Sequence, residues 1–378
     1  MNKRIFILSI LSLLFFAGSL RASIGITDLR VEQLKSPIGI DVRQPRLGWR
    51  IESDEQNVMQ TAYHILVASS PELLAQGKGD IWDSGKIESD ASQWITYQGK
   101  SLKRNTPYYW KVKAYTNKGE ADWSAPASWS MGLLNEADWQ GQWIGLDRAA
   151  PGDSETQWSR LAARYLRKEF ALSKEVKRAT IHIAGMGLYE LFINGQRIGN
   201  QVLAPAPTDY RKTILYNTYD VTSQLQKENA IGVTLGNGRF YTMRQNYKPY
   251  KIPTFGYPKL RLNLIVEYTD GSKETISTNT SWKLITEGPI RSNNEYDGEE
   301  YDARKEMPGW NRVGFDDSRW QEARRCAVPD GTLRPQPTEG IVETPYPHRP
   351  RIVSPLGNHK STSLTPATHH PTPLILDF

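Results

Sequence analysis

The stretch Leu102-Lys103-Arg104-Asn105-Thr106-Pro107-Tyr108-Tyr109-Trp110-Lys111-Val112-Lys113-Ala114 decides the fold of the first part of this chain. Apolar and other residues alternate in it, which predicts a β-strand that buries Tyr108, Trp110, Val112 and Ala114 on one face. Leu102 and Thr106 precede Tyr108 at the spacing of a tyrosine corner, in which the phenol hydroxyl bonds to main chain a few residues upstream. The pattern therefore predicts an antiparallel β-sandwich.

A tryptophan on another strand is expected to fill the core opposite this face. Trp49 ends the segment Pro45-Arg46-Leu47-Gly48-Trp49, and strand-like runs recur at 63–68 and 93–97 with turn residues between them. Short strands at this spacing are typical of antiparallel sandwiches. Residues 25–134 therefore resemble a fibronectin type III-like domain, with Trp49 as the core tryptophan of the opposing strand.

The second module, residues 138–330, is also predicted to be β-structure. Leu260, Leu262, Leu264 and Val266 alternate with other residues and form one buried stripe. The dipeptide Asn194-Gly195 separates two strand-like runs and suits the type I′ turn of a hairpin. We expect a galactose-binding-like jelly-roll β-sandwich here, so the predicted fold class of the whole chain is all-β.

The N-terminus has the pattern of an export signal. Lys3 and Arg4 precede an apolar run over residues 5–16, and small residues follow it up to Ala22. This order predicts a signal peptide over residues 1–22, cleaved around Ala22. The apolar run is short for a membrane-spanning helix, so we expect no membrane span after cleavage. The protein is predicted to be exported, to the periplasm or the extracellular space.

The formal charge of +6 comes mostly from the two ends of the chain. Residues 1–22 hold three basic side chains and no acidic one, and residues 346–378 add a net +2. The body lacks the basic excess of nucleic-acid-binding proteins, so we expect no nucleic-acid partner. Cys326, the single cysteine, is interpreted as an incidental thiol. Residues 331–378 are predicted to be a linker and irregular tail, because from about residue 346 prolines and histidines gather without periodicity.

These residues together resemble the N-terminal half of bacterial α-L-rhamnosidases of glycoside hydrolase family 78. The resemblance covers about residues 25–345. It rests on a series of motifs in the family's order, among them Pro45 to Trp49, Trp82-Asp83-Ser84-Gly85-Lys86, Trp143-Ile144-Gly145, Tyr189 to Gly195, Thr208-Asp209-Tyr210 and the run over residues 290–304.

The resemblance implies that full-length members remove terminal α-L-rhamnose from plant glycans and glycosides by an inverting reaction. In such a reaction one carboxylic acid protonates the leaving oxygen and a second carboxylate activates water. In the family both groups lie on a six-hairpin α/α barrel that follows the part resembled here. We therefore expect no catalytic residue in this chain and no cofactor. The expected partners are the missing catalytic domain and, through the full-length enzyme, rhamnose-containing glycans.

One loop of the second module has the residue types of a sugar-binding site. Asn237, Arg239, Tyr241 and Arg244 follow a strand-like run within eight residues. Aromatic rings stack on sugar faces, and amide and guanidinium groups bond to hydroxyls, so these four residues are candidates for carbohydrate binding. The alternative is a loop ordered against a neighbouring domain.

Some family members bind rhamnose through calcium in the second module, with an Asp-Asn pair just before the hairpin strand. Here that place is Ala184-Gly185-Met186-Gly187-Leu188-Tyr189, which offers neither carboxylate nor amide. Calcium needs oxygen ligands of those kinds, so we predict no metal site.

An acidic run lies further along the second module, at Glu295, Asp297, Glu299, Glu300 and Asp302. Paired carboxylates are the catalytic groups of glycosidases. The basic neighbours Arg291, Arg304 and Lys305 favour charge pairing instead. We interpret Glu299, Asp302 and Arg304 as residues of an interface to the missing catalytic domain.

Three hypotheses about function remain open. The leading one is an exported accessory part of an α-L-rhamnosidase that is not catalytic by itself. The alternative is a free-standing secreted carbohydrate-binding module. The third is an enzyme with its chemistry in the second module, in which case hydrolysis of a rhamnoside would depend on Asp302.

Overall fold

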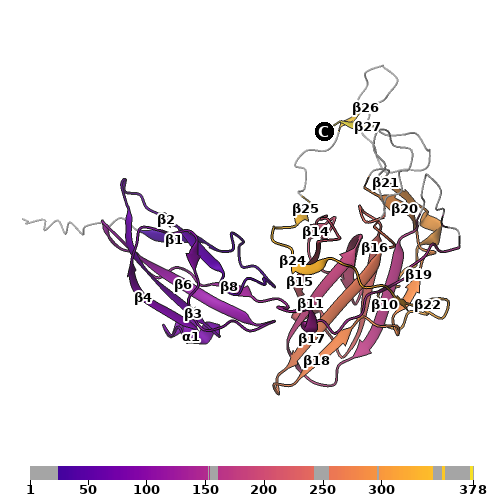
Figure 1. Ribbon diagram of the computed structural model, residues 1–378, viewed down its shortest axis with the longest axis horizontal. Coiled ribbons are helices and arrows are strands. Elements are labelled where there is room, and N and C mark those ends of the chain that lie inside the picture. Colours follow the sequence, from indigo (N-terminus) through magenta and orange to yellow (C-terminus); the bar gives the residue numbers. More distant parts are fainter. Residues whose placement is uncertain are drawn as a thin grey trace, which may run out of the picture.

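The computed structural model describes residues 24–151, 153, 161–241, 255–295, 298–343, 351–353 and 375–377, the last two segments as backbone strands. The predicted signal peptide over residues 1–22 lies outside the described residues. Two β-sandwich domains follow each other along the long axis of the molecule (Figure 1). The predicted all-β class is confirmed. No helix in the described part of the chain is long and apolar enough to cross a membrane.

The first domain consists of two antiparallel sheets. One sheet has the order β1-β2-β5, and the other has the order β4-β3-β6-β7, with β8 also paired to β6. Their strands are β1 (Gly25–Val31), β2 (Arg46–Glu52), β3 (Gln60–Ala68), β4 (Trp82–Glu88), β5 (Ile95–Thr96), β6 (Pro107–Thr116), β7 (Gly119–Glu120) and β8 (Ala127–Ser130). A short helix, α1 (Pro71–Ala75), follows β3 and begins at the N-cap Ser70.

The core of this domain confirms the period-two pattern on β6. Tyr108, Trp110, Val112 and Ala114 are all buried, while the residues between them are partly exposed. The tyrosine corner is present: the Lys103 N–H donates to the Tyr108 hydroxyl oxygen at 2.8 Å. Trp49 on β2 is fully buried between the sheets, as predicted, because its strand lies in the opposite sheet.

The second domain is a larger sandwich whose long strands alternate between two sheets, as a jelly roll requires. The first sheet contains β13 (Gln196–Arg197), β12 (Leu188–Ile193), β16 (Glu228–Gly236), β10 (Arg164–Ala171), β19 (Lys283–Ile285) and β22 (Gln321–Glu322). The second contains β23 (Arg324–Arg325), β9 (Ile144–Gly145), β17 (Lys259–Tyr268), β11 (Val176–Met186), β15 (Thr213–Asp220) and β24 (Thr332–Pro335), with β18 (Lys273–Ser277) paired to β17.

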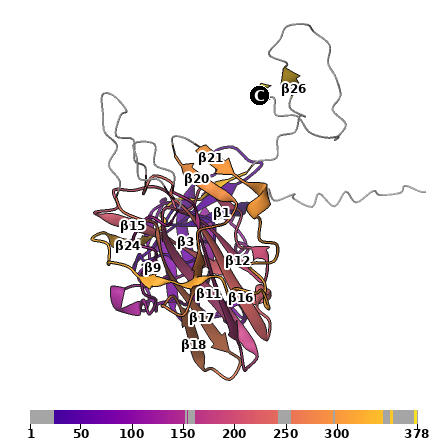
Figure 2. The same cartoon turned by 90° about the vertical axis from the view of Figure 1, so that its right-hand side faces the viewer.

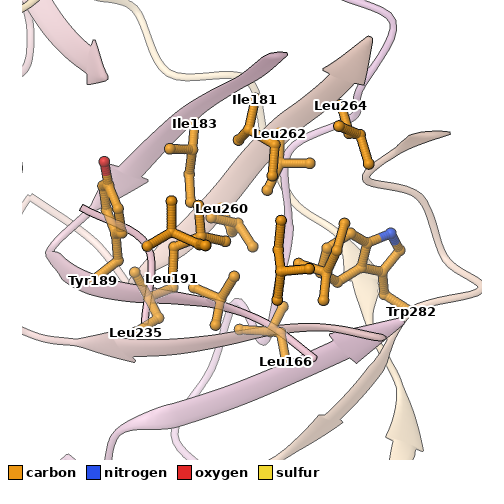
Figure 3. Close-up of a cluster of buried hydrophobic side chains, with 14 of the residues drawn as sticks. Leu166, Ile181, Ile183, Tyr189, Leu191, Leu235, Leu260, Leu262, Leu264 and Trp282 are labelled. Atoms are coloured by element: carbon orange, nitrogen blue, oxygen red, sulfur yellow. The ribbon is translucent and has the colours of Figure 1, made fainter. Parts of the chain in front are cut away.

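The predicted leucine stripe on β17 forms the centre of the core between these sheets. Leu260, Leu262 and Leu264 face side chains of the opposite sheet such as Leu191 and Leu235 (Figure 3). Each of these five side chains is at most 1% exposed. Full burial of one leucine contributes about 1.5–3 kcal/mol, so this stripe is a main source of stability for the domain.

The hairpin predicted at Asn194-Gly195 joins β12 to β13. Asn194 has φ 51° and Gly195 has φ 82°, so both central residues are left-handed, as a type I′ turn requires. The described part of the chain also contains three 3₁₀ helices: η1 (Glu136–Asp138), η2 (Thr222–Gln224) and η3 (Ala303–Lys305).

Part of the segment predicted as an irregular tail, residues 331–378, is strand instead. β24 extends the second sheet by pairing in parallel with β15, and β25 (Ile341–Val342) pairs with β14 (Gln201–Val202). The physical reason is that β15 leaves main-chain groups open at the sheet edge, and Leu333 packs partly buried beside Ile214 when β24 fills it. The short β26 (Arg351–Val353) and β27 (Ile375–Asp377) also pair, and other residues of the tail beyond Glu343 lie outside the described residues.

The connector between the domains, which includes Trp139 and Gly141, covers the outer face of the second sheet of the second domain. That face is polar although buried: the Arg261 Nε donates to the Gly141 carbonyl oxygen at 2.6 Å, and the Gly141 N–H donates to Asn263 Oδ1 at 2.8 Å. Trp139 of the connector packs edge-on against Tyr216 with ring centroids 5.2 Å apart. These contacts fasten the start of the second domain to β15 and β17.

Candidate functional site

The two regions singled out in the sequence meet at one end of the second domain. The loop that leaves β16 lies against the hairpin of β20 (Ile290–Asn294) and β21 (Gly298–Tyr301), which Figure 2 shows at the upper end of the sandwich. We call residues 237–241, 290–295 and 298–311 the hairpin end. Although they are more than 50 residues apart in the chain, the predicted sugar-binding loop and the predicted interface residues are therefore neighbours.

Asn237 holds the loop to the hairpin. Its side chain is 2% exposed, and its Nδ2 donates to the carbonyl oxygens of Leu161 at 2.6 Å and Asn293 at 2.8 Å. The Asn237 N–H in turn donates to Asn293 Oδ1 at 2.6 Å. These bonds use both hydrogens of the Asn237 Nδ2, while its Oδ1 is buried with no hydrogen-bond partner among the described residues. Asn237 therefore positions the loop, and its buried side chain could meet a ligand only after the loop opens.

The other predicted sugar-binding residues are placed differently. Arg239 is partly exposed and forms an ion pair with Glu295 at 3.3 Å. Tyr241 is 3% exposed and stacks on Tyr257 with centroids 5.5 Å apart. Arg244 lies outside the described residues. The loop therefore presents the Arg239 guanidinium group at its surface, and carbohydrate binding by this loop stays a prediction.

The predicted interface residues lie on the exposed side of the hairpin end. Asp302 accepts from Arg304 Nε at 2.8 Å and Nη2 at 2.9 Å, and it caps η3 through the Arg304 N–H at 3.2 Å. The hydrogen bonds from Arg304 hold the pKa of Asp302 below its usual value. Burial, followed by the nearby Glu190 carboxylate, raises the pKa of Glu299. An interface role for these residues stays a prediction.

Within the described residues of the acidic run, the expected charge pairing is present at one of the three basic neighbours. Arg304 pairs with Asp302, as predicted. Arg291 instead donates through Nη1 to the main-chain oxygens of Thr286 at 2.8 Å and Gly288 at 3.1 Å. Its guanidinium group is therefore used to close the turn that leads into β20.

A pocket of about 270 Å³ beside the hairpin end was not foreseen from the sequence. Tyr165 and Trp310 line it with rings at right angles and centroids 5.3 Å apart. Glu306 also lines it and accepts from the Tyr301 hydroxyl at 2.8 Å. Aromatic rings beside a carboxylate can bind a hydroxylated ligand. The signal in the sequence was Pro308-Gly309-Trp310-Asn311, a tryptophan among turn residues.

The two carboxyl groups of this end whose pKa is shifted differ in direction. A general acid for glycoside hydrolysis needs a raised pKa; the pKa of Asp302 is lowered, which disfavours that role for Asp302, whereas the pKa of Glu299 is raised. Among the residues that the structure describes, no group of three or more His, Cys, Asp or Glu side chains could hold a metal ion. Cys326 is buried, and this burial raises the pKa of its thiol to about 12, so thiolate chemistry at neutral pH is disfavoured.

Comparison with known families and structures identifies both domains. Residues 174–345 match the α-L-rhamnosidase N-terminal domain, and residues 26–135 match the N-terminal immunoglobulin domain of Rha78A-like proteins. An α-L-rhamnosidase of Formosa agariphila is 37% identical over 350 residues, which cover 86% of this chain and 37% of that protein.

The chain belongs to the α-L-rhamnosidase family.

Solved α-L-rhamnosidase structures agree in fold with the two domains. The enzyme of Dictyoglumus thermophilum is 40% identical with a TM-score of 0.73, covering 82% of this chain and 35% of that one. The Streptomyces avermitilis enzyme, solved in complex with L-rhamnose, is 26% identical with a TM-score of 0.72, covering 83% and 46%. The chain spans about a third of the length of the curated α-L-rhamnosidases that it matches, and it corresponds to their N-terminal portion.

Proposed function

We propose that this chain acts as the N-terminal accessory part of an enzyme that hydrolyses terminal α-L-rhamnose, with the chemistry in a further domain. The observation that carries the proposal is coverage: the match to a relative named α-L-rhamnosidase covers 86% of this chain, with its two β-domains, but 37% of that relative. The described residues fit this division of labour, because Asp302 is engaged with Arg304 and Glu306 with Tyr301. Rhamnose-containing glycans are the proposed substrates of the longer enzyme.

The test compares this chain with a longer protein that includes the remaining length of the relatives. The longer protein is expected to release the aryl group from an aryl α-L-rhamnoside, and this chain is expected to release none above the buffer rate. Rhamnoside hydrolysis by this chain that disappears in Asp302→Ala would contradict the proposal and favour an active site in the second domain.

The hairpin end is our proposed contact surface for that further domain. The Arg304 side chain is 89% exposed, and Tyr301 is 54% exposed on the neighbouring strand. A large aromatic residue beside an exposed guanidinium group is the composition of many interface centres. In the longer protein, Tyr301→Ser and Arg304→Ala are expected to lower the unfolding temperature, whereas in this chain they leave it nearly unchanged. Equal effects in both proteins would argue against the contact.

A binding role for the loop after β16 remains a second candidate, because Arg239 keeps its guanidinium group partly exposed beside the hairpin. Arg239→Ala is expected to weaken binding of a rhamnose-containing oligosaccharide in calorimetry. An unchanged affinity would remove Arg239 from the candidates.

We also propose that the protein is exported, on the basis of the pattern over residues 1–22. Mass spectrometry of the expressed protein is expected to find a new N-terminus near Ser23. An intact Met1 in the mature protein would contradict export by this signal.

A further inference from the structure

A second cavity, of about 290 Å³, lies between the two domains. One wall is the loop over residues 34–40 of the first domain. The other wall combines the turn at 199–201, the end of β15 and the segment at 335–339, which belong to the second domain. We call this cavity the interdomain cleft. Ligand sites occur preferentially at such domain boundaries, and this volume suits one sugar ring better than an oligosaccharide.

The two walls are held at a fixed distance. Gly39 approaches β15 so closely that a Cβ atom there would lie 2.1 Å from Thr218 Oγ1, which excludes any larger residue. Next to it the Tyr216 hydroxyl donates to the carbonyl oxygen of Leu133 at 3.2 Å across the domain boundary. A cleft with fixed walls loses little conformational entropy when a ligand enters, and this favours binding.

The floor of the cleft contains three side-chain amides with long bonds to each other. Gln336 also accepts from the Ala206 N–H at 3.1 Å and donates to the Thr338 carbonyl oxygen at 3.3 Å. Asn217 is 6% exposed, and its Oδ1 accepts from the Tyr189 hydroxyl at 2.7 Å. Its Nδ2 reaches Gln201 Oε1 and Gln336 Oε1 at 3.3 Å each, which is long for a hydrogen bond. A ligand hydroxyl at an ordinary hydrogen-bond distance could replace each of these two long bonds at a small cost in free energy. This is possible because an amide group can both donate to a hydroxyl and accept from it.

The charges and apolar groups of the cleft narrow the class of ligand. Its charged lining residues are Lys35 and Glu339, both exposed at the rim, and Lys35 pairs with Asp28 at 3.5 Å. Amides and hydroxyls inside the cleft therefore favour a neutral ligand with many hydroxyls. Ile38, which is 48% exposed, adds an apolar edge to the same cavity. A ring with hydroxyls on one side and a methyl group on the other would satisfy both surfaces.

We propose that the interdomain cleft binds a single neutral sugar residue, with Asn217, Gln201 and Gln336 bonding to its hydroxyls and Ile38 contacting an apolar group. The assignment of that residue as L-rhamnose, a deoxy sugar with a methyl group, rests on the proposed function. The cleft is separate from the hairpin end, since the described lining of the cleft includes no residue of 237–241, 290–295 or 298–311.

The test titrates the full chain with methyl α-L-rhamnopyranoside and, separately, with methyl α-D-glucopyranoside in a calorimeter. We expect saturable binding of the rhamnoside and a weaker response to the glucoside. Gln201→Ala removes an amide from the floor, and Thr338→Trp fills the cavity from the exposed segment, so each variant should weaken binding about fivefold or more. Gln98→Ala is the matched control, because Gln98 is an exposed glutamine outside the cleft.

Each outcome decides a different point. Absence of saturable binding by either glycoside, or binding that Gln201→Ala and Thr338→Trp leave intact, overturns the cleft proposal. Preference for the glucoside with the same dependence on the variants supports a sugar cleft and overturns its assignment to rhamnose. The proposed function fails separately, if the longer protein does not hydrolyse an aryl α-L-rhamnoside. Arg239→Ala should leave cleft binding unchanged, and this separates the cleft from the loop after β16.

Discussion

Asn105 of the first domain lies with its Oδ1 3.1 Å from Nε2 of the buried His182 in the second domain. The same residue accepts from Arg178 Nη1 at 2.7 Å through its main-chain oxygen, and Thr218 Oγ1 lies 3.0 Å from the other ring nitrogen of His182. Asn105 belongs to the loop that the tyrosine corner closes. One loop therefore stabilises the first domain and also joins it to the second.

The contact of Asn105 with His182 is expected to contribute measurably to stability. Asn105 has φ 47°, and Asn105→Gly keeps this left-handed backbone without strain while it removes the side chain. The loss leaves a buried ring nitrogen without its partner, so the free energy of unfolding should fall by about 1–3 kcal/mol. Denaturant unfolding monitored by tryptophan fluorescence measures it.

Asn57→Gly is the matched control for that experiment. Asn57 also has a positive φ of 58° but is exposed. A control variant that loses as much stability as Asn105→Gly would attribute the effect to the backbone and not to the domain contact.

Protonation of His182 should make the protein less stable in acid. Burial, followed by the Arg178 charge, lowers the pKa of His182 to about 3, whereas the unfolded value is 6.5. Between these values the unfolded chain binds one proton more than the folded chain. The contribution of neutral, buried His182 to the free energy of unfolding is therefore fully present above pH 6.5. It is lost as the pH falls, by up to about 1.4 kcal/mol per pH unit.

His182→Gln tests this expectation, because glutamine keeps a hydrogen-bonding group that does not titrate. Urea unfolding between pH 7 and pH 4 should give a shallower decrease of stability in the variant than in the unsubstituted protein. Parallel curves for the two proteins would show that His182 is not the group responsible.

The tyrosine corner gives a third prediction. Tyr108→Phe removes the acceptor of the Lys103 N–H and should lower the free energy of unfolding by about 1 kcal/mol. Tyr109→Phe serves as its control, because Tyr109 lies on the opposite face of the same strand and is only partly buried. The guanidinium chloride concentration at the unfolding midpoint should be clearly lower for Tyr108→Phe than for Tyr109→Phe. Equal midpoints for the two variants would count against the tyrosine corner as a stabilising bond.

In the loop after β16, Asn237 anchors the loop and Arg239 lies at its surface, and a pair of substitutions can separate these two roles. Asn237→Ala removes the amide that bonds to Leu161 and Asn293, so it should cost about 2–3 kcal/mol of stability. Arg239→Ala removes a partly exposed ion pair with Glu295 and should change stability by less than about 1 kcal/mol. Thermal unfolding of both variants measures the difference. A larger loss for Arg239→Ala would reverse the assignment of anchor and surface residue.

Local pattern predicted much of the fold. The alternation along β6, the stripe Leu260, Leu262 and Leu264, and the Asn194-Gly195 turn all came out as expected, because each depends on neighbours within a few residues. The prediction was wrong for residues 332–335, where a strand depends on a free sheet edge more than 100 residues away in the chain.

The candidate site was predicted less well than the fold, and Asn237 shows why. Its residue type suggested sugar binding, but its burial depends on Asn293, which reaches it only in the folded sandwich. Arg239 forms an ion pair with Glu295, an acid that we expected to pair with basic residues near it in the sequence. This contact, too, exists only in the folded sandwich. Trp310 was overlooked because its contact with Tyr165 joins segments far apart in the chain.

The sequence by itself determined the all-β class, the positions of the strands with strong alternation and the family resemblance, since these follow from residue types at short spacing. Tertiary structure alone decided that Asn105 would reach His182, that the two regions of the hairpin end would meet, and that amides from three separate segments would line one cleft. The physical reason is that burial and hydrogen bonding belong to pairs of groups, and a sequence names the groups without naming their partners.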